Sequence, residues 1–179
     1  SHPHRSFLVL EARADMGGTW DLFRYPGIRS DSDMFTLGYR FRPWTDPDAI
    51  AEGHRIRDYI ADTARAYEVD ELVHYRRRVT ALGWCGEQAR WTATIERTDT
   101  GEVEQLRARH VHACTGYYRY DEGYTPDLPG ADGFRGEIVH PQHWPDDLDL
   151  TERHVVVVGS GATAVTLVPA LAARAGHVT

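Results

Sequence analysis

The chain has 179 residues, of which 41% are hydrophobic, and a formal net charge of −7. This composition supports a packed globular core, and the excess of acidic over basic side chains argues against a nucleic-acid-binding surface. The sequence has no apolar run of the ~20 residues that a membrane-spanning helix needs, and no signal peptide opens it. Its two cysteines and ten scattered histidines show neither metal-ligand spacing nor a disulfide framework. We therefore expect a cytoplasmic protein without a membrane span or a bound metal.

The first expected element is a short apolar strand, residues 7–10, which ends at Glu11. An acidic residue at the end of the second strand of a dinucleotide fold commonly hydrogen-bonds the ribose hydroxyls. Glu11 is therefore a candidate ligand of an adenosine ribose, and a solvated carboxylate after an edge strand is the alternative. The first strand of such a fold, with its G-x-G-x-x-G turn, belongs roughly 20 residues upstream of that acid, and this sequence does not contain it. We expect a fragment that begins inside a domain.

Two glycine-containing segments follow, at residues 16–20 and 24–31. Glycine pairs let backbone N–H groups approach an anion or a planar ring closely, and Trp20 adds a large flat face with one hydrogen-bond donor. A tight turn with a tryptophan that anchors a long loop explains the same residues. The residue types alone favour this structural interpretation.

The middle of the chain reads as scaffold. Apolar residues recur at helical spacing over residues 48–67, and Asp46-Pro47 supplies a start signal. From residue 74 to 114 the period changes to two, which predicts a meander of three strands with turns near 86–87 and 98–101. A further strand at 111–114 then leads into Thr115-Gly116, where glycine would permit close approach of a ligand or serve an ordinary turn.

A Gly-, Pro- and Asp-rich linker at 121–133 precedes the last part of the chain. Four valines at 155–158 suit a strand buried on both faces of a parallel sheet. They lead into G-x-G-x-x-A at 159–164 and a helical stretch at 165–175, which is a strong dinucleotide-binding signal in that context. Gly159 makes the tight turn, Gly161 lets the backbone reach a pyrophosphate, and Ala164 permits close helix–strand packing. The N–H groups of Ser160, Ala162 and Thr163 face the phosphate at the helix N-terminus.

Three motifs together carry a family resemblance. Residues 17–20 read G-G-x-W, residues 24–31 read R-Y-P-G-x-R-x-D, and residues 134–145 read F-x-G-x-x-x-H-x-x-x-W-P. The sequence resembles the Baeyer–Villiger monooxygenases, flavin enzymes that use NADPH and oxygen to turn ketones into esters, and every fixed position of their fingerprint is filled. Within that family it is most similar to the actinobacterial subgroup that includes the thioamide-activating monooxygenase of mycobacteria.

The resemblance implies an α/β fold with two Rossmann-like dinucleotide-binding domains. Residues 1–132 would form a partial FAD-binding domain with an inserted β-meander, and 133–145 a linker that carries the fingerprint. Residues 146–179 would begin a truncated NADP-binding domain. We expect Phe134 and Trp144 to pack as anchors of the linker.

Site residues follow from the resemblance position by position. The flavin-binding segments of the family correspond here to Gly18, Thr19, Trp20, Val79, Thr115 and Gly116. Asp31 would lie near the isoalloxazine ring and orient an active-site arginine, with Asp33 as the second-ranked carboxylate. His140 would couple cofactor binding to domain movement, unless it is a structural histidine held by a backbone hydrogen bond.

The implied reaction uses FAD, NADPH and O2. NADPH reduces FAD, oxygen is captured as a C4a-peroxyflavin, and this species inserts one oxygen atom into a small ketone to give an ester or lactone. A flavin-dependent oxygenase of nitrogen or of thioether sulfur is the first alternative. The second is an inactive fragment or binding module. NADPH rather than NADH is implied by the resemblance alone.

Overall fold

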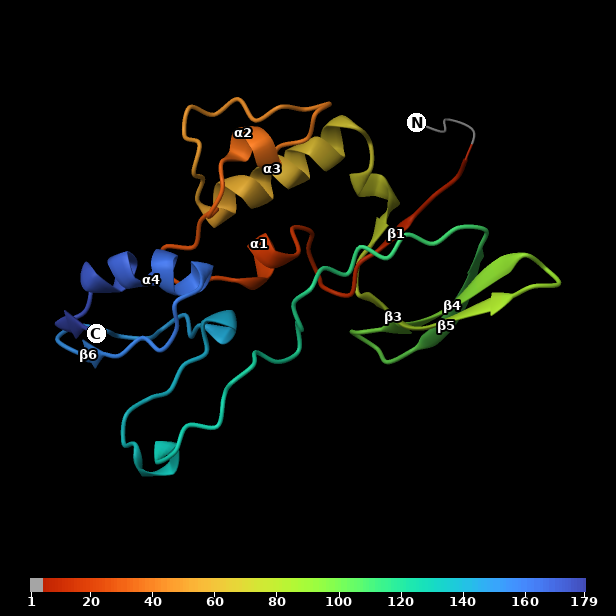
Figure 1. The fold of residues 1–179 in the computed structure, drawn as a ribbon. Coiled ribbons are helices and arrows are strands. Elements are labelled where there is room, and N and C mark those ends of the chain that lie inside the picture. Colours follow the sequence, from red (N-terminus) through yellow and green to blue (C-terminus); the bar gives the residue numbers. More distant parts are fainter. Residues whose placement is uncertain (1–4) are drawn as a thin grey trace. The chain divides into compact units, whose positions relative to one another are not determined.

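The computed structural model describes residues 5–179, and they divide into two compact units. The first unit contains the described residues up to Gly17 together with Tyr59–Tyr117, and the second contains Gly18–Asp58 together with Tyr118–Thr179. Figure 1 shows both, with several of their helices and strands labelled. The units are not the ranges 1–132 and 146–179, so the domain boundaries stay a prediction. No helix among residues 5–179 is long and apolar enough to cross a membrane.

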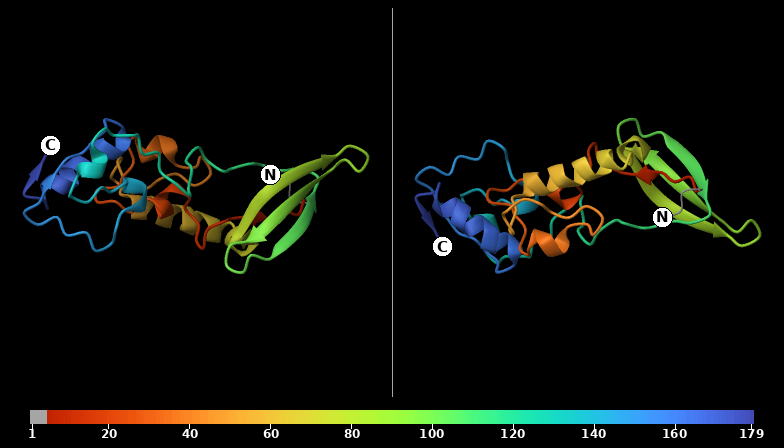
Figure 2. Two further views of the ribbon diagram at one scale, coloured as in Figure 1. Left: turned by 90° about the horizontal axis from the view of Figure 1, so that it is seen from below. Right: turned by 90° about the horizontal axis from the view of Figure 1, so that it is seen from above.

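The first unit contains a parallel strand pair and the predicted meander. Strand β1 (Val9–Leu10) pairs in parallel with β2 (Val73–His74), which follows the short helix η1 (Asp70–Leu72). Strands β3 (Arg77–Cys85), β4 (Arg90–Arg97) and β5 (Val103–Ala108) form an antiparallel sheet in that order. Figure 2 shows its twist. Ala93 and Ile95 on the central strand are buried, as strand alternation requires. The prediction of three strands is confirmed.

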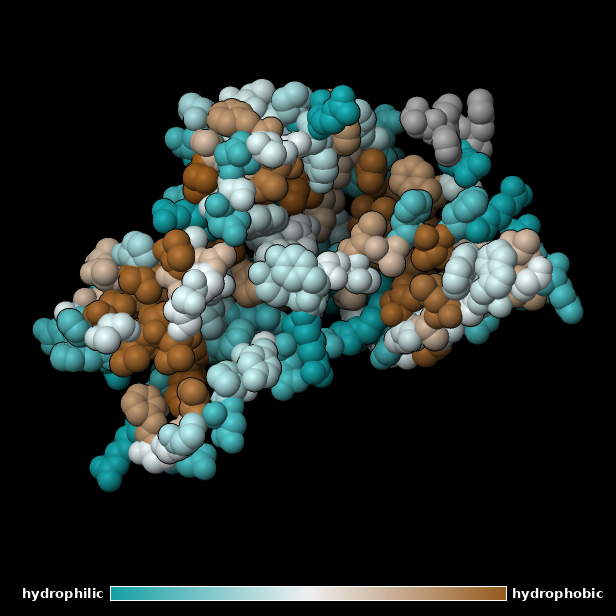
Figure 3. Space-filling view, viewed as in Figure 1, coloured by the Kyte–Doolittle hydropathy of each residue, from teal (hydrophilic) through white to brown (hydrophobic). Residues whose placement is uncertain are grey.

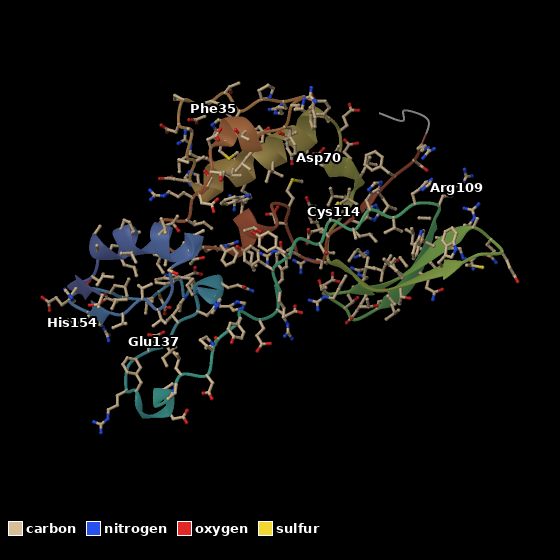
Figure 4. All side chains as sticks on the ribbon, in the orientation of Figure 1. Phe35, Asp70, Arg109, Cys114, Glu137 and His154 are labelled. Carbon is tan, nitrogen blue, oxygen red and sulfur yellow. The ribbon has the colours of Figure 1, made fainter. Side chains whose placement is uncertain are left out.

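The strand predicted at residues 111–114 is not found. These residues pair with no strand in the described part of the chain, and Cys114 is exposed. Figure 4 labels Cys114 on this extended segment. Apolar alternation predicts a strand only where a neighbouring backbone completes the ladder. That neighbour cannot be read from the segment itself.

Helix α3 (Gly53–Ala66) begins later than the predicted position 48. Residues 49–53 are instead hydrogen-bonded to the preceding loop, with Ser30 N–H donating to Ala51 O at 2.8 Å and Gly53 N–H donating to Ile28 O at 2.9 Å. These bonds use backbone groups that a longer helix would need. Ile56, an apolar residue at the predicted helical spacing, is buried, whereas Tyr67 at the end of the predicted range is 51% exposed.

The second unit contains a β–α–β segment. Strands β6 (His154–Val155) and β7 (His177–Val178) pair in parallel, and α4 (Ala162–Ala172) makes the crossover that a parallel pair requires. The unit also has four short helices: α1 (Thr19–Leu22), α2 (Met34–Leu37), η2 (Ala131–Gly133) and η3 (Pro141–His143). Its core consists of Phe23, Tyr25, Leu150, Leu167 and Leu171. Segments distant in the sequence therefore meet on α4.

The four valines are not buried on both faces, contrary to the prediction. Val155 and Val157 pack against the core, whereas Val156 and Val158 are 71% and 74% exposed. In Figure 3, hydrophobic side chains gather around α4 and β6. Alternate residues of a strand point to opposite faces, and among the described residues only one face of this two-stranded sheet is covered.

Candidate functional site

The loop at residues 17–31, called here the tryptophan loop, begins with two glycines at positive φ. Gly17 has φ +119° and Gly18 has φ +53°, a conformation that other residues rarely adopt. Gly18 precedes α1, whose first two residues are Thr19 and Trp20, and its carbonyl accepts from Leu22 N–H at 2.9 Å. Trp20 is half-buried. The backbone of Gly18 therefore fixes where α1 begins and, with it, the position of Trp20.

The loop ends at Asp31, and the structure distinguishes this residue from Asp33. Ser30 is 2% exposed and its hydroxyl accepts from Ala51 N–H at 3.1 Å, which anchors the residue just before Asp31. Asp31 itself is exposed. The Asp33 carboxylate caps α2 by accepting from Thr36 N–H at 2.8 Å, a structural use. This difference supports the ranking of Asp31 above Asp33, while the catalytic part of Asp31 stays a prediction.

The segment at residues 159–164, called here the glycine turn, leads into α4. Gly159 has φ +149°, so its backbone favours glycine. Gly161 is the N-cap of α4 at φ −80° and ψ −176°, a conformation open to any residue. A Cβ added at either glycine would meet no atom within 4 Å. Neither backbone conformation nor packing inside the chain explains the glycine at position 161.

The amide groups of the glycine turn fit an anionic ligand. Ala162, Thr163 and Ala164 occupy the first turn of α4, where helical N–H groups have no intrahelical acceptor. No side chain caps this end of α4, and Ser160 beside it is exposed. A helix N-terminus with open space in front of it favours a phosphate. A dinucleotide pyrophosphate would fit this arrangement, and ligand binding there stays a prediction.

The tryptophan loop and α4 are in direct contact. A Cβ at Gly27 would lie 2.5 Å from Thr166 O and 2.7 Å from Ala170 Cβ, so only glycine allows this approach. The buried hydroxyls of Tyr25 and Thr166 are 3.0 Å apart. The sequence carries no signal for this pairing. Two motifs more than 100 positions apart are thus parts of one packed unit.

His140 has a structural hydrogen bond. Its Nδ1 accepts from Gln142 N–H at 3.2 Å, and its ring lies so close to Gly123 that a Cβ there would be 2.2 Å from Cε1. Gln142 is 5% exposed, and its side-chain amide donates to Arg119 O at 2.6 Å. These contacts match the structural alternative for His140, and a part in catalysis stays a prediction.

The fingerprint's aromatic residues behave differently from each other. Trp144 packs against the core of the second unit, as predicted. Phe134 is 61% exposed, so it is not the buried anchor that the sequence suggests. Its ring lies instead against Gly136, where an added Cβ would be 2.5 Å from Phe134 Cζ. The Phe134 ring therefore covers the backbone of Gly136.

The remaining predicted residues belong to the first unit. Glu11 follows β1, and its Oε1 accepts from Arg13 N–H at 2.9 Å. Val79 lies in β3 beside a β-bulge, which re-aims side chains and leaves backbone groups unpaired. Thr115 and Gly116 are exposed, and Gly116 has φ +70°. The ligand contacts of these four residues stay predictions.

One ionisable side chain near Glu11 has a shifted pKa. Burial raises the pKa of Tyr75, and the negative charges of Asp15, Glu11 and Asp70 raise it further. The phenol therefore remains a neutral hydrogen-bonding group at physiological pH. It lies within the electrostatic reach of the candidate ribose ligand.

Asp21 is a buried carboxylate that the sequence interpretation missed. It is 4% exposed, and its Oδ1 lies 3.5 Å from Arg24 Nη2 and 3.9 Å from Arg57 Nη1. A buried charge requires such partners. The signal for it was an acidic residue inside the apolar run of residues 20–23. The two arginines also line a cavity of about 380 Å³ together with Trp20, Asp21, Gly27 and His54.

A family model described as flavin-binding monooxygenase-like matches residues 43–179. The putative FAD-containing monooxygenase MymA of Mycobacterium tuberculosis is 55% identical over 99% of this chain and 37% of its own length. The FAD-containing monooxygenase EthA of Mycolicibacterium smegmatis is 53% identical over 99% of this chain and 36% of its own length. The chain thus spans about a third of the length of these curated relatives.

Solved structures of monooxygenases also match this chain. OTEMO in complex with FAD and NADP is 29% identical with a TM-score of 0.80, over 99% of this chain and 34% of that one. Oxidised steroid monooxygenase bound to NADP is 29% identical with a TM-score of 0.79, over 96% of this chain and 33% of that one. Cyclohexanone-bound cyclohexanone monooxygenase is 27% identical with a TM-score of 0.77, over 96% and 32%. These matches confirm the predicted α/β fold class.

Proposed function

The chain belongs to the flavin-binding monooxygenase-like family, and from this premise we propose that the whole protein is an FAD- and NADPH-dependent monooxygenase. It inserts one oxygen atom of O2 into a small ketone and releases an ester or lactone. FAD supplies the redox chemistry when bound, by accepting hydride from NADPH and activating oxygen. The protein supplies binding, orientation and a preorganised polar environment. Relatives named as FAD-containing monooxygenases, and neighbours that hold FAD, NADP or cyclohexanone, support this proposal.

The observation that carries the proposal is the glycine turn in front of α4. Gly161 has an ordinary backbone conformation and open space beyond it, so its missing side chain serves something other than this chain. The amides of Ala162, Thr163 and Ala164 would donate to the pyrophosphate of NADPH. Ser160 would add an N–H group at the same end. Gly159 makes the positive-φ turn that aims these groups.

The residues that would bind the flavin are those implied by the family. Gly18, Thr19 and Trp20 of the tryptophan loop would contact FAD, and Glu11 would accept from its ribose hydroxyls. Val79, Thr115 and Gly116 would approach the rest of the cofactor through their backbones. The positive φ of Gly18 and Gly116 supports close backbone approach at these two positions.

Two side chains would act nearer the reaction. Asp31 is exposed at the end of an anchored loop, so its carboxylate is available to orient a cationic side chain at the flavin. His140 is fixed against Gly123 and Gln142 in the linker, with Nδ1 already accepting a hydrogen bond. In the neutral ring the proton is therefore on Nε2. This N–H group can donate to a cofactor or to the domain whose movement His140 would couple to cofactor binding. We place the whole protein in the cytoplasm, which suits the two unpaired cysteines.

The direct test uses the purified whole protein, at the length of its relatives, with NADPH and 18O2. A cyclic ketone and an aryl methyl thioether are offered in parallel. We expect a flavin absorption spectrum, NADPH consumption that depends on the ketone, and a lactone that carries one 18O atom. A protein that binds no flavin would contradict the proposal. Oxygen transfer to the thioether alone would replace it with sulfur oxygenation.

A further inference from the structure

We propose that Tyr25 is a positioning residue, which through Thr166 aligns the first turn of α4 with the tryptophan loop and thereby sets the geometry of hydride transfer. The proposal rests on the proposed function, because it concerns the alignment of the two cofactor sites. The structural basis is a series of hydrogen bonds that runs from Tyr25 in the R-Y-P-G segment to the first turn of α4, next to the glycine turn.

The direction of the hydrogen bonds follows from their geometry. The Thr166 hydroxyl donates to the carbonyls of Ala162 and Thr163, each at 3.1 Å. The single hydrogen of this hydroxyl is shared between the two carbonyls, which can only accept, and in this arrangement Thr166 Oγ1 accepts from Tyr25, 3.0 Å away. The phenol of Tyr25 therefore donates. These hydrogen bonds run from Tyr25 through Thr166 to Ala162 and Thr163, two of the residues whose N–H groups would face the pyrophosphate.

The surroundings make this contact rigid. Tyr25 is 6% and Thr166 is 4% exposed, so neither hydroxyl exchanges its partner for bulk water. Gly27 lies against the same turn of α4, where a Cβ would be 2.5 Å from Thr166 O. Tyr25 and Leu167 also share the core of the second unit. The loop is thus fixed to α4 by one close backbone approach and one directed hydrogen bond.

The hydrogen bond adds direction rather than bulk. Phenylalanine at position 25 would keep nearly all of the packing, because Tyr25 differs from it by one hydroxyl group. Apolar packing alone is non-directional, whereas a buried hydroxyl pair selects one arrangement of loop and helix. Since misplacement of a reacting group by about 1 Å can cost up to 100-fold in rate, this selection matters for transfer between two cofactors.

The experiment compares Tyr25→Phe, Thr166→Val, the double variant and Thr166→Ser in the whole protein. Anaerobic stopped-flow measurement gives the rate constant of flavin reduction and, from its dependence on NADPH, the dissociation constant. We expect the first two variants to lower the rate constant about tenfold, with the dissociation constant changed less than about twofold. The double variant should match the worse single one, because both remove the same bond. Thr166→Ser keeps the hydroxyl and should keep the rate.

A second readout decides the proposal without any catalysis. The amide of Val165 donates to Gly161 O at the start of α4, and that of Ala175 donates to Leu171 O after its end. Tyr25→Phe should speed hydrogen exchange at Val165 at least threefold and leave Ala175 unchanged. Thr63→Val is the matched control, since Thr63 is a buried helical threonine that donates to Tyr59 O in α3. It should leave exchange at Val165 and flavin reduction unchanged.

The outcomes separate the two proposals. If NADPH fails to reduce the flavin of the unaltered protein, the proposed function is wrong, and the exchange at Val165 still decides whether Tyr25 positions α4. If Tyr25→Phe does not fold, Thr166→Val and Thr166→Ser carry both measurements. Unchanged exchange and unchanged reduction in Tyr25→Phe or Thr166→Val would overturn the positioning role. Additive losses in the double variant would do the same.

Discussion

Gly27 in the tryptophan loop packs against α4 and Gly161 in the glycine turn is the N-cap of the same helix, yet they are glycines for different reasons. Gly27 has φ +80°, and the space in front of it is filled by the backbone of Thr166. Gly161 has φ −80°, and the space in front of it is empty of protein atoms to 4 Å. The chain itself explains the first glycine. We propose that a bound ligand explains the second glycine.

The same distinction divides two carboxylates. Asp33 uses its carboxylate to cap α2, whereas Asp31, two positions earlier, is exposed on an anchored loop. In the sequence, a carboxylate that caps a helix and a carboxylate available to a ligand look the same. The structure separates those that the fold requires from those available to a ligand.

The largest effect is expected from Gly27→Ala. The new Cβ would meet Thr166 O at 2.5 Å in a backbone conformation that alanine disfavours. Strain and overlap together should lower the free energy of unfolding by about 2–4 kcal/mol. Denaturant titration measures this loss. An unfolding free energy within about 0.5 kcal/mol of the original would show that the loop is not packed on α4 as described.

The carboxylate pair should give opposite results. Asp31→Ala is expected to reduce ketone oxygenation on the order of 100-fold without loss of stability, because only a polar interaction at the flavin is removed. Asp33→Ala should instead lower stability by about 1 kcal/mol through loss of the α2 cap, with turnover retained. Product formation and thermal unfolding are measured on both. Full turnover in Asp31→Ala would remove this residue from the catalytic group.

Gly161→Ala should separate binding from folding. The methyl group enters space that is empty of protein, so we expect the unfolding free energy to change by less than about 1 kcal/mol. We expect the dissociation constant for NADPH to rise about tenfold, because the backbone no longer reaches the pyrophosphate. Gly86→Ala is the matched control, since an added Cβ there also meets nothing within 4 Å. Equal NADPH affinity in the two variants would place the nucleotide elsewhere.

The smallest effect concerns acid stability. Hydrogen bonds from the backbone and side chain of Thr151 lower the pKa of the Asp149 carboxyl below its ordinary value of 3.8. A depressed pKa in the folded state contributes stability above the unfolded pKa, and this is lost as pH falls through the folded value. Asp149→Asn should therefore flatten the decline of the unfolding midpoint between about pH 4 and about pH 2. An identical decline in both proteins would contradict this assignment.

Local patterns predicted the elements whose neighbours are local. The meander was found because its strands are sequential and alternate, and the glycine turn because its residues follow a strand and open a helix. Features that depend on distant partners were missed. The start of α3 depends on bonds to residues 28–34, and the exposure of Val156 and Val158 depends on what covers their face of the sheet.

The candidate site shows the same limit. Its glycine and tryptophan motifs were visible in the sequence, as was the preference for Asp31 over Asp33. The pairing of Tyr25 with Thr166 joins residues 141 positions apart and has no local pattern. Asp21 was hidden because burial of a charged residue depends on the arginines that surround it.

Hydrogen exchange of residues 159–167 in the whole protein, with and without NADP+, tests most directly whether the glycine turn is the nucleotide site. We predict that NADP+ slows exchange at the amides of Ala162, Thr163 and Ala164 several-fold, because phosphate oxygens accept from N–H groups that α4 leaves without acceptors. The β3–β4 turn near Gly86 should exchange equally in both samples. Slowed exchange elsewhere in the protein, with residues 159–167 unchanged, would contradict the account.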